Sequence, residues 1–292
     1  MVKSFAVMLF SLVCGVARAD VPPPDIQVSD QGMQVVINVP QTRLFLYQDG
    51  QLVKSFPVAV GKMLTRTPTG SFAVTGIYHD PSWYVPKSIQ NELREQGKPV
   101  LTMVPPGDDN PLGKVFIRFG EQSLGLGIHG TNAPGSVPGF RSHGCVRMKN
   151  PDVLELSGKV NVGDAVTVAY QAILLNLDQN GQLWMTVYRN LYQHDDVSMP
   201  LLAQVLLNWQ HDHGTAIYGR RVDRALSQRT GKPVCLTCRH DDVEYAGQTL
   251  TALRWLSAPP GGLTPEERNA PVAAPEENSG QAEQHGPGQP PT

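Results

Sequence analysis

Four apolar, β-branched runs follow one another in quick succession near the start of the chain. They lie at residues 34–40, 42–47, 52–60 and 71–78, and each has the length of an ordinary strand. The connections are short, and the Asp49-Gly50 pair is a strong hairpin signal. Strands so close together leave no room for helices between them, so we expect this part of the chain to fold as a β-rich unit.

Further strands are predicted at 114–119, 124–129 and 165–170, with a short helix at 150–157 before the last of them. The segment 80–110 breaks this pattern, because it places aromatic residues between prolines and then a helix-forming run. We interpret it as an insertion or lid. Residues 34–170 thus form one predicted domain that is mainly β.

The stretch from His129 to Arg147 carries the chemistry. It reads His-Gly-Thr-Asn-Ala-Pro-Gly-Ser-Val-Pro-Gly-Phe-Arg-Ser-His-Gly-Cys-Val-Arg. A cysteine acts as a nucleophile only as its thiolate, so Cys145 needs a nearby base and donors that stabilise charge on the attacked carbonyl. The histidines and glycines of this stretch supply both, which predicts nucleophilic catalysis rather than a structural cysteine.

The first 19 residues predict a secretory signal peptide. Lys3 is followed by an apolar run from Phe5 to Val16 and by the cleavage pattern Ala17-Arg18-Ala19. Cys14 would leave with this segment, so three cysteines remain in an oxidising compartment. Cys235 and Cys238 are close enough in sequence to pair, which leaves Cys145 as the free thiol.

A zinc site is the main chemical alternative for the cysteine pair. Cys235, Cys238 and His240, together with His211 or His213, are ligand types that zinc accepts, although their spacing is irregular. A disulfide, a structural zinc site and no joint role therefore all stay open at this stage.

Composition excludes several other classes of protein. The formal net charge of -2 gives no basic excess for nucleic acid, and no stretch after residue 20 is apolar enough to span a bilayer. We predict a small α+β accessory subdomain at 171–257. Residues 258–292 are rich in proline, glycine, glutamate and glutamine, which predicts a disordered tail.

Residues 129–147 closely resemble the signature of the L,D-transpeptidase catalytic domain family of the YkuD type. That signature is a His-Gly pair followed by Ser-His-Gly-Cys and an Arg or Asn two residues later. The resemblance extends over 34–170 and includes Thr67-Pro68-Thr69-Gly70 and Trp83-Tyr84-Val85-Pro86. It implies a β-sandwich-like catalytic domain with short helices, and it implies neither a cofactor nor a metal.

The resemblance also assigns roles to single residues. It implies that Cys145 is the nucleophile and His129 the general base, with the carbonyl of Gly130 orienting His129. Backbone N–H groups around Gly144 and Cys145 would form the oxyanion hole. His143 is nearer to Cys145 in sequence, but in the family the earlier histidine carries the base role.

Five further residues are predicted to bind substrate. Arg147 has a planar fork that suits a substrate carboxylate, and Trp83 and Tyr84 would close over the thioester and exclude water. The signature residues Ser142 and His143 complete the set.

The family resemblance implies a periplasmic enzyme of peptidoglycan that is open to acylation by carbapenems. Its substrate would be a tetrapeptide stem, which acylates the cysteine and loses D-alanine. The acceptor would be the lysine of a Braun-type outer-membrane lipoprotein, because residues 171–240 resemble proteobacterial members of the ErfK/YbiS kind. A second stem, giving a 3-3 crosslink, and water, giving carboxypeptidase activity, are alternatives, and a non-catalytic wall-binding scaffold is a distant one.

Overall fold

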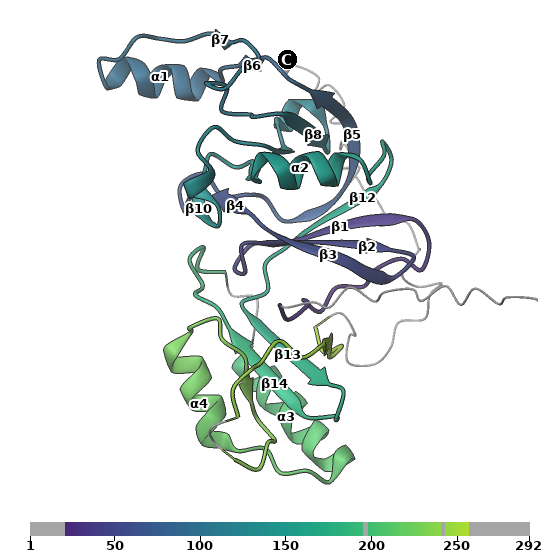
Figure 1. The fold of residues 1–292 in the computed structure, drawn as a ribbon. Coiled ribbons are helices and arrows are strands. Elements are labelled where there is room, and N and C mark those ends of the chain that lie inside the picture. Colours follow the sequence, from purple (N-terminus) through teal and green to yellow (C-terminus); the bar gives the residue numbers. More distant parts are fainter. Residues whose placement is uncertain (1–20, 195–197, 241–242, 257–292) are drawn as a thin grey trace, which may run out of the picture. The chain divides into compact units, whose positions relative to one another are not determined.

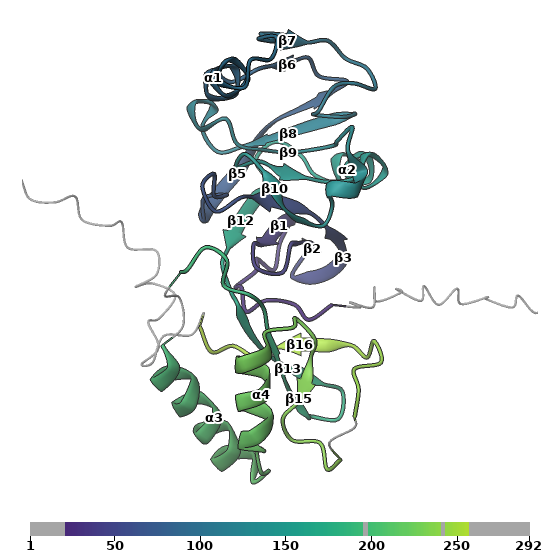
Figure 2. The ribbon, with the colours of Figure 1, turned by 90° about the vertical axis from the view of Figure 1, so that its left-hand side faces the viewer.

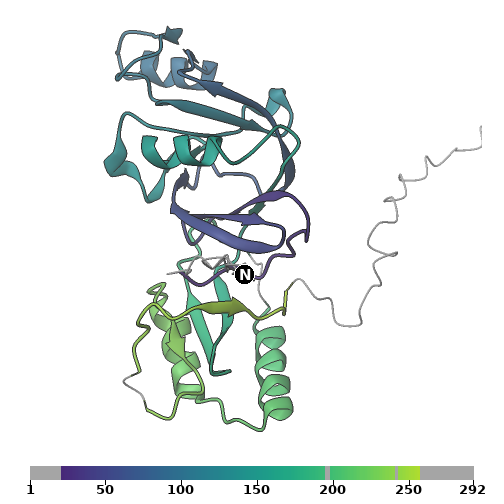
Figure 3. The same cartoon turned by 45° about the vertical axis from the view of Figure 1, so that its right-hand side comes forward.

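A computed structural model describes residues 21–194, 198–240 and 243–256. The expected signal peptide and the expected disordered tail lie outside the described residues. Ten strands form one mixed sheet in the order β10-β4-β11-β9-β8-β5-β12-β1-β2-β3. Its strands curl around the core of the domain (Figures 1 and 3). Their bounds are β1 Met33–Asn38, β2 Arg43–Gln48, β3 Gln51–Pro57, β4 Ala59–Gly61, β5 Gly70–His79, β8 Val115–Phe119, β9 Gly127–His129, β10 Gly139–Ser142, β11 Val146–Arg147 and β12 Ala165–Ala169. The prediction of a mainly β fold is confirmed.

The hairpin predicted at Asp49-Gly50 is present. Strands β2 and β3 pair antiparallel with Gln48 opposite Gln51, so the two residues between them form the turn. Both have positive φ, 49° at Asp49 and 75° at Gly50, as a type I′ turn requires. The predicted strand at 124–129 is shorter than expected. Residues Gln122–Leu124 form a 3₁₀ turn (η1) that ends at Gly125, and β9 begins only at Gly127.

The core of this sheet is aliphatic and aromatic. Its buried residues include Ile37, Leu46, Phe56, Ile117 and Ile128, all at most 1% exposed. Helix α2 (Asn150–Ser157) lies against β8 and β9 and buries Val153 and Leu156 in the same core (Figure 1). Strand β9, which ends at the start of the catalytic stretch, and its neighbour β8 are therefore packed against helix α2 on the side that faces the core.

The segment 80–110 is an insertion with little buried surface. It contains a two-stranded hairpin, β6 (Trp83–Tyr84) with β7 (Met103–Val104), and helix α1 (Lys87–Glu95), which has no fully buried residue (Figure 2). Segments with few buried apolar contacts are typically the ones that open locally at low cost, and the role of this insertion as a lid stays a prediction.

The region after residue 170 has its own sheet and core. Strands β13 (Ile173–Asp178), β14 (Leu183–Val187), β15 (Val234–Cys235) and β16 (Leu250–Ala252) form a sheet in the order β15-β14-β13-β16. Helices α3 (Met199–His213) and α4 (Gly219–Gln228) bury Leu206, Trp209 and Ala225 with it (Figure 2). Helix α4 was not predicted, because its sequence is mostly polar and its one charged buried residue, Arg221, hides the apolar pattern.

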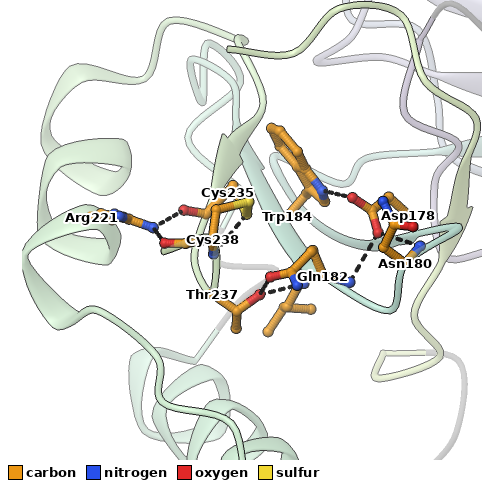
Figure 4. The surroundings of a disulfide bond; sticks show 9 residues. Asp178, Asn180, Gln182, Trp184, Arg221, Cys235, Thr237 and Cys238 are labelled. Atoms are coloured by element: carbon orange, nitrogen blue, oxygen red, sulfur yellow. Dashed lines mark hydrogen bonds between the residues drawn. A yellow bond between two sulfur atoms is a disulfide. The ribbon is translucent and has the colours of Figure 1, made fainter. Parts of the chain in front are cut away.

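Cys235 and Cys238 form a disulfide, so the first of the three alternatives for this pair is the one in the structure (Figure 4). Arg221 is 3% exposed and donates through Nη1 to the carbonyls of both cysteines, at 3.0 and 2.6 Å. Sulfurs joined to each other are not available to zinc as thiolates. Across the described ranges, three or more His, Cys, Asp or Glu side chains nowhere cluster as metal ligands. Nor does any helix within those ranges have the length and apolarity to cross a membrane.

Candidate active site

Two neighbouring parallel strands bring Arg147 and His129 to the same face of the sheet. Strand β11 pairs with β9 so that Val146 lies opposite Ile128 and Arg147 opposite His129. Val146 and Ile128 point into the core, with 0% exposure. Side chains alternate along a strand, so Arg147 and His129 share the opposite face. Cys145 directly precedes β11, and its Sγ lies 3.3 Å from the carbonyl oxygen of Gly125, two residues before β9 begins.

The imidazole of His129 is fixed in one tautomer. Its Nδ1 lies 2.6 Å from the carbonyl oxygen of Gly130, and a carbonyl only accepts, so Nδ1 carries the proton. The ring also stacks on Phe116, with centroids 6.3 Å apart. Neutral His129 therefore keeps Nε2 unprotonated, which is the form that a general base needs.

Burial keeps His129 neutral. The residue is 5% exposed, and this burial lowers its pKa to about 4, with a further lowering from the charge of Arg147; the hydrogen bond to Gly130 opposes both. At neutral pH the imidazole is thus ready to accept a proton without first losing one.

Burial also keeps the Cys145 thiol neutral, because it raises the pKa of that thiol. A backbone hydrogen bond from Gly127 and the charge of Arg147 lower the same pKa, but less strongly. The thiol donates to the carbonyl of Gly125 at 3.3 Å, which is consistent with a protonated sulfur. Cys145 is the free cysteine among the described residues. The site therefore holds a neutral thiol and a neutral imidazole, so Cys145, if it attacks as predicted, must lose its proton during the attack.

A tight turn at 142–145 presents Cys145. Ser142 is 1% exposed, and its hydroxyl donates to the carbonyl of Cys145 and accepts the N–H of Gly144 at 3.3 Å. Gly144 has a φ of 111°, a region that side chains with a Cβ rarely adopt. The substrate contact expected for Ser142 and the oxyanion role expected for Gly144 stay predictions; the contacts give both residues a part in shaping the turn.

Arg147 lies beside the nucleophile with unused donor capacity. Its Nε is buried and has no hydrogen-bond partner among the residues that the structure describes. Burial lowers the pKa of its guanidinium, and the neighbouring Cys145 opposes this. A buried donor of this kind is normally paired, and the carboxylate contact expected for Arg147 stays a prediction.

The other predicted substrate residues lie at the lid. His143 contacts the lid helix, with its Nε2 3.4 Å from Oε2 of Glu92. The two side chains are 36% and 48% exposed, so the pair contributes little to lid closure. Trp83 is half-buried, whereas Tyr84 is 78% exposed. Tyr84 thus offers an aromatic surface on the lid hairpin, and the role of both aromatics in covering the thioester stays a prediction.

Two asparagines that were not predicted as site residues organise the surroundings. Asn110 is fully buried, and its Nδ2 donates to the carbonyls of Pro81, Val104 and Pro105, which ties together the base of the lid. Asn150 is the first residue of helix α2, which has no side-chain cap. Its Oδ1 accepts the backbone N–H groups of Lys114 and Thr131, at 3.2 and 3.1 Å. The two partners of Asn150 and the Pro81 partner of Asn110 lie 19 to 36 positions away, so no short sequence pattern signals these contacts.

We expect Asn150→Ala to lower the free energy of unfolding by about 2 kcal/mol, because two partly buried N–H groups lose their acceptor. Chemical denaturation measures the change. Asn132→Ala is the matched control, since it removes one exposed hydrogen bond, to the carbonyl of Asp109, and should cost less than about 1 kcal/mol. Equal losses in the two variants would contradict a structural role for Asn150.

Comparison with known proteins gives this fold and site a family. The L,D-transpeptidase catalytic domain family, YkuD, matches residues 32–168. A putative L,D-transpeptidase YkuD of Bacillus licheniformis is 32% identical over 157 residues, which cover 54% of this chain and 72% of the relative. The chain belongs to the L,D-transpeptidase catalytic domain family.

Relatives from enteric bacteria match a longer part of the chain. The probable L,D-transpeptidase ErfK/SrfK of Escherichia coli is 30% identical over 207 residues, covering 68% of this chain and 66% of the relative. The probable L,D-transpeptidase YbiS of the same species is 28% identical over 212 residues, covering 69% of this chain and 67% of the relative. The chain therefore spans about two thirds of the length of these curated relatives.

Solved structures also align with the chain. An L,D-transpeptidase from Mycobacterium smegmatis aligns with a TM-score of 0.38 and 21% identity, over 47% of this chain and 58% of that one. The catalytic domain of the Enterococcus faecium L,D-transpeptidase aligns with a TM-score of 0.37 over 98% of that chain and 48% of this one, also at 21% identity.

Proposed function

We propose that the protein is a periplasmic L,D-transpeptidase that acts on peptidoglycan through Cys145. The observation that carries the proposal is the pairing of strands β9 and β11. This pairing places His129, a neutral imidazole held in one tautomer, beside the strand that follows the cysteine turn. A signal peptide predicted at the N-terminus and the disulfide between Cys235 and Cys238 support an exported, oxidising location.

The proposed reaction has two transfers. The sulfur of Cys145 attacks the carbonyl of the L-centre residue of a tetrapeptide stem, and its proton passes to Nε2 of His129. The tetrahedral intermediate collapses when the C–N bond breaks, and D-alanine leaves as an amine with the proton from His129. An acceptor amine then attacks the thioester and loses a proton to His129, and Cys145 leaves with that proton.

Arg147 is proposed to bind a carboxylate of the stem. Its Nε is buried without a partner among the described residues, and its guanidinium is close enough to Cys145 for its charge to lower the pKa of that thiol. A guanidinium that binds a carboxylate in two places fixes the stem in register, so that the attacked carbonyl meets the sulfur.

For the acceptor we propose the lysine of an outer-membrane lipoprotein. Support comes from the extent of the enteric matches. The catalytic-domain match ends at residue 168, and residues 1–168 make up well under two thirds of the chain. The match to ErfK/SrfK covers 68% of the chain, so it must include residues after the catalytic domain. The sequence resemblance of residues 171–240 to lipoprotein-attaching members points the same way.

Purified chain incubated with tetrapeptide muropeptides tests the reaction and the acceptor together. Mass spectrometry should find a Cys145 adduct that lacks one D-alanine, and adding a peptide that ends in lysine should give a joined product. Joined stems without the lysine peptide would assign 3-3 crosslinking instead, and loss of D-alanine alone would assign carboxypeptidase activity. Unchanged tetrapeptide without an adduct would leave only the scaffold alternative.

A further inference from the structure

Tyr192 lies far from Cys145 in sequence but contacts the loop that supports the cysteine turn. It follows β14, in the region after the catalytic domain, and it is 1% exposed. Its hydroxyl donates to the carbonyl of Gly61 at 2.7 Å and accepts the N–H of Thr67 at 3.1 Å. One phenol group therefore closes both ends of residues 61–67, here called the 61–67 loop.

The ring of Tyr192 is fixed from several sides. It stacks on Tyr170 with centroids 5.2 Å apart, and Phe140 of β10 meets it edge-on at 5.8 Å. The guanidinium of Arg66 lies 5.5 Å from its centroid. The N–H of Tyr192 also donates to the hydroxyl of Tyr170 at 2.9 Å. A side chain held in this way keeps its hydroxyl in one place, so it can hold the 61–67 loop in one conformation.

The 61–67 loop in turn holds the cysteine turn. The N–H of Lys62 and the hydroxyl of Thr65 both donate to the carbonyl of Ser142, at 3.1 and 3.0 Å. Ser142 then bonds through its hydroxyl to the backbone of Gly144 and Cys145. Strand β4, which leads into the loop, lies between β10 and β11, the strands that enter and leave the turn.

We infer that Tyr192 is a positioning residue for the acylation step, and that the region after residue 170 supports catalysis by holding the cysteine turn through the 61–67 loop. This inference rests on the proposed function of Cys145. The groups it fixes are the backbone N–H donors at the turn, whose direction decides how well they stabilise the oxyanion. Errors of a few tenths of an ångström there cost rate without unfolding the protein.

Tyr192→Phe in the full chain is the direct test, because it keeps the ring and removes both hydrogen bonds. We expect acylation by a carbapenem to slow about tenfold, and kcat for a stem tetrapeptide to fall with KM little changed. Alkylation of Cys145 by iodoacetamide needs no oxyanion hole and should stay within about twofold of wild type.

Tyr188→Phe is the matched control. It removes a phenol hydroxyl of the same region, one that accepts from Gln41 at 3.1 Å and does not touch the 61–67 loop. We expect its acylation rate to stay within about twofold of wild type. Thr65→Val removes the next link in the chain of contacts at a partly exposed site, and it should slow acylation in the same direction as Tyr192→Phe.

Two results would overturn the inference: Tyr192→Phe acylating as fast as wild type, or Tyr188→Phe slowing it equally. Hydrogen exchange at residues 142–145, followed by mass spectrometry, provides a readout that does not depend on activity. Tyr192→Phe should speed this exchange and Tyr188→Phe should not. A wild-type chain that is never acylated would refute the proposed function, while the exchange data would still decide whether Tyr192 holds the turn.

Discussion

Cys145→Ser is expected to slow acylation by a carbapenem or a stem tetrapeptide by at least about 10⁴-fold, to below detection. The hydroxyl of serine is far less acidic than a thiol. Burial raises the pKa of the Cys145 thiol, but a thiol still gives up its proton to the neutral imidazole of His129 far more readily than a hydroxyl does. Intact-protein mass spectrometry measures the adduct, and peptide mapping locates it.

The other two cysteines of the described chain are an internal control for this experiment. Cys235 and Cys238 are joined to each other, so neither offers a thiol to the reagent. Wild-type chain beginning at Asp20 should therefore take up one acyl group, on Cys145. An adduct of equal yield on Cys145→Ser would show that another residue is the nucleophile.

His129→Ala is expected to slow the same acylation by about 10²- to 10⁴-fold, the contribution of a positioned general base. The variant loses the imidazole of His129, whose tautomer is fixed by the carbonyl of Gly130 and which lies beside strand β11. Stopped-flow measurement of carbapenem acylation resolves rates over this range.

His143→Ala is the matched control, since His143 is the histidine next to the cysteine turn in sequence. Its side chain is partly exposed and paired with Glu92 on the lid helix. We expect its rate to fall less than about tenfold, because an exposed pair of this kind contributes little. The reverse order of effects would assign the base to His143.

The pH dependence follows from the same histidine. Because the pKa of His129 in the folded protein is about 4, the acylation rate should be nearly constant from pH 5.5 to pH 7.5 and fall as His129 is protonated near pH 4.

The free energy of unfolding changes over a different pH range. The unfolded chain binds a proton at the ordinary value of 6.5, so stability is complete above that pH and falls by about 3 kcal/mol as pH drops from 6.5 to 4.

The pH-dependent part of the stability should be smaller in His129→Gln, which cannot take up that proton. Denaturation of both proteins at pH 7 and at pH 4.5 measures the difference. A wild-type rate that falls in step with a group of pKa near 6.5 would mean that His129 is solvated rather than buried in solution.

Much of the site is local in sequence, and this is why it was predictable. His129, Ser142, Gly144 and Cys145 lie within 17 residues of one another, so one short stretch contains the residue types that nucleophilic catalysis needs. The early strands were predictable for a similar reason, because each alternates or is β-branched over its own length. The Asp49-Gly50 turn fixes its hairpin without outside help.

Only the tertiary structure revealed the contacts between residues that are far apart in the sequence. Tyr192 meets Gly61 across 131 positions, and Asn150 meets Lys114 across 36, so no window of sequence contains both ends of either contact. The short strands β10 and β11 exist only because β4 and β9 pair with them. The sequence by itself determined the mainly β class, and local residue chemistry was enough to predict Cys145 as the nucleophile and His129 as the base. Only the fold decided what holds Cys145 in position, because hydrogen bonds between distant segments form when the chain has already packed.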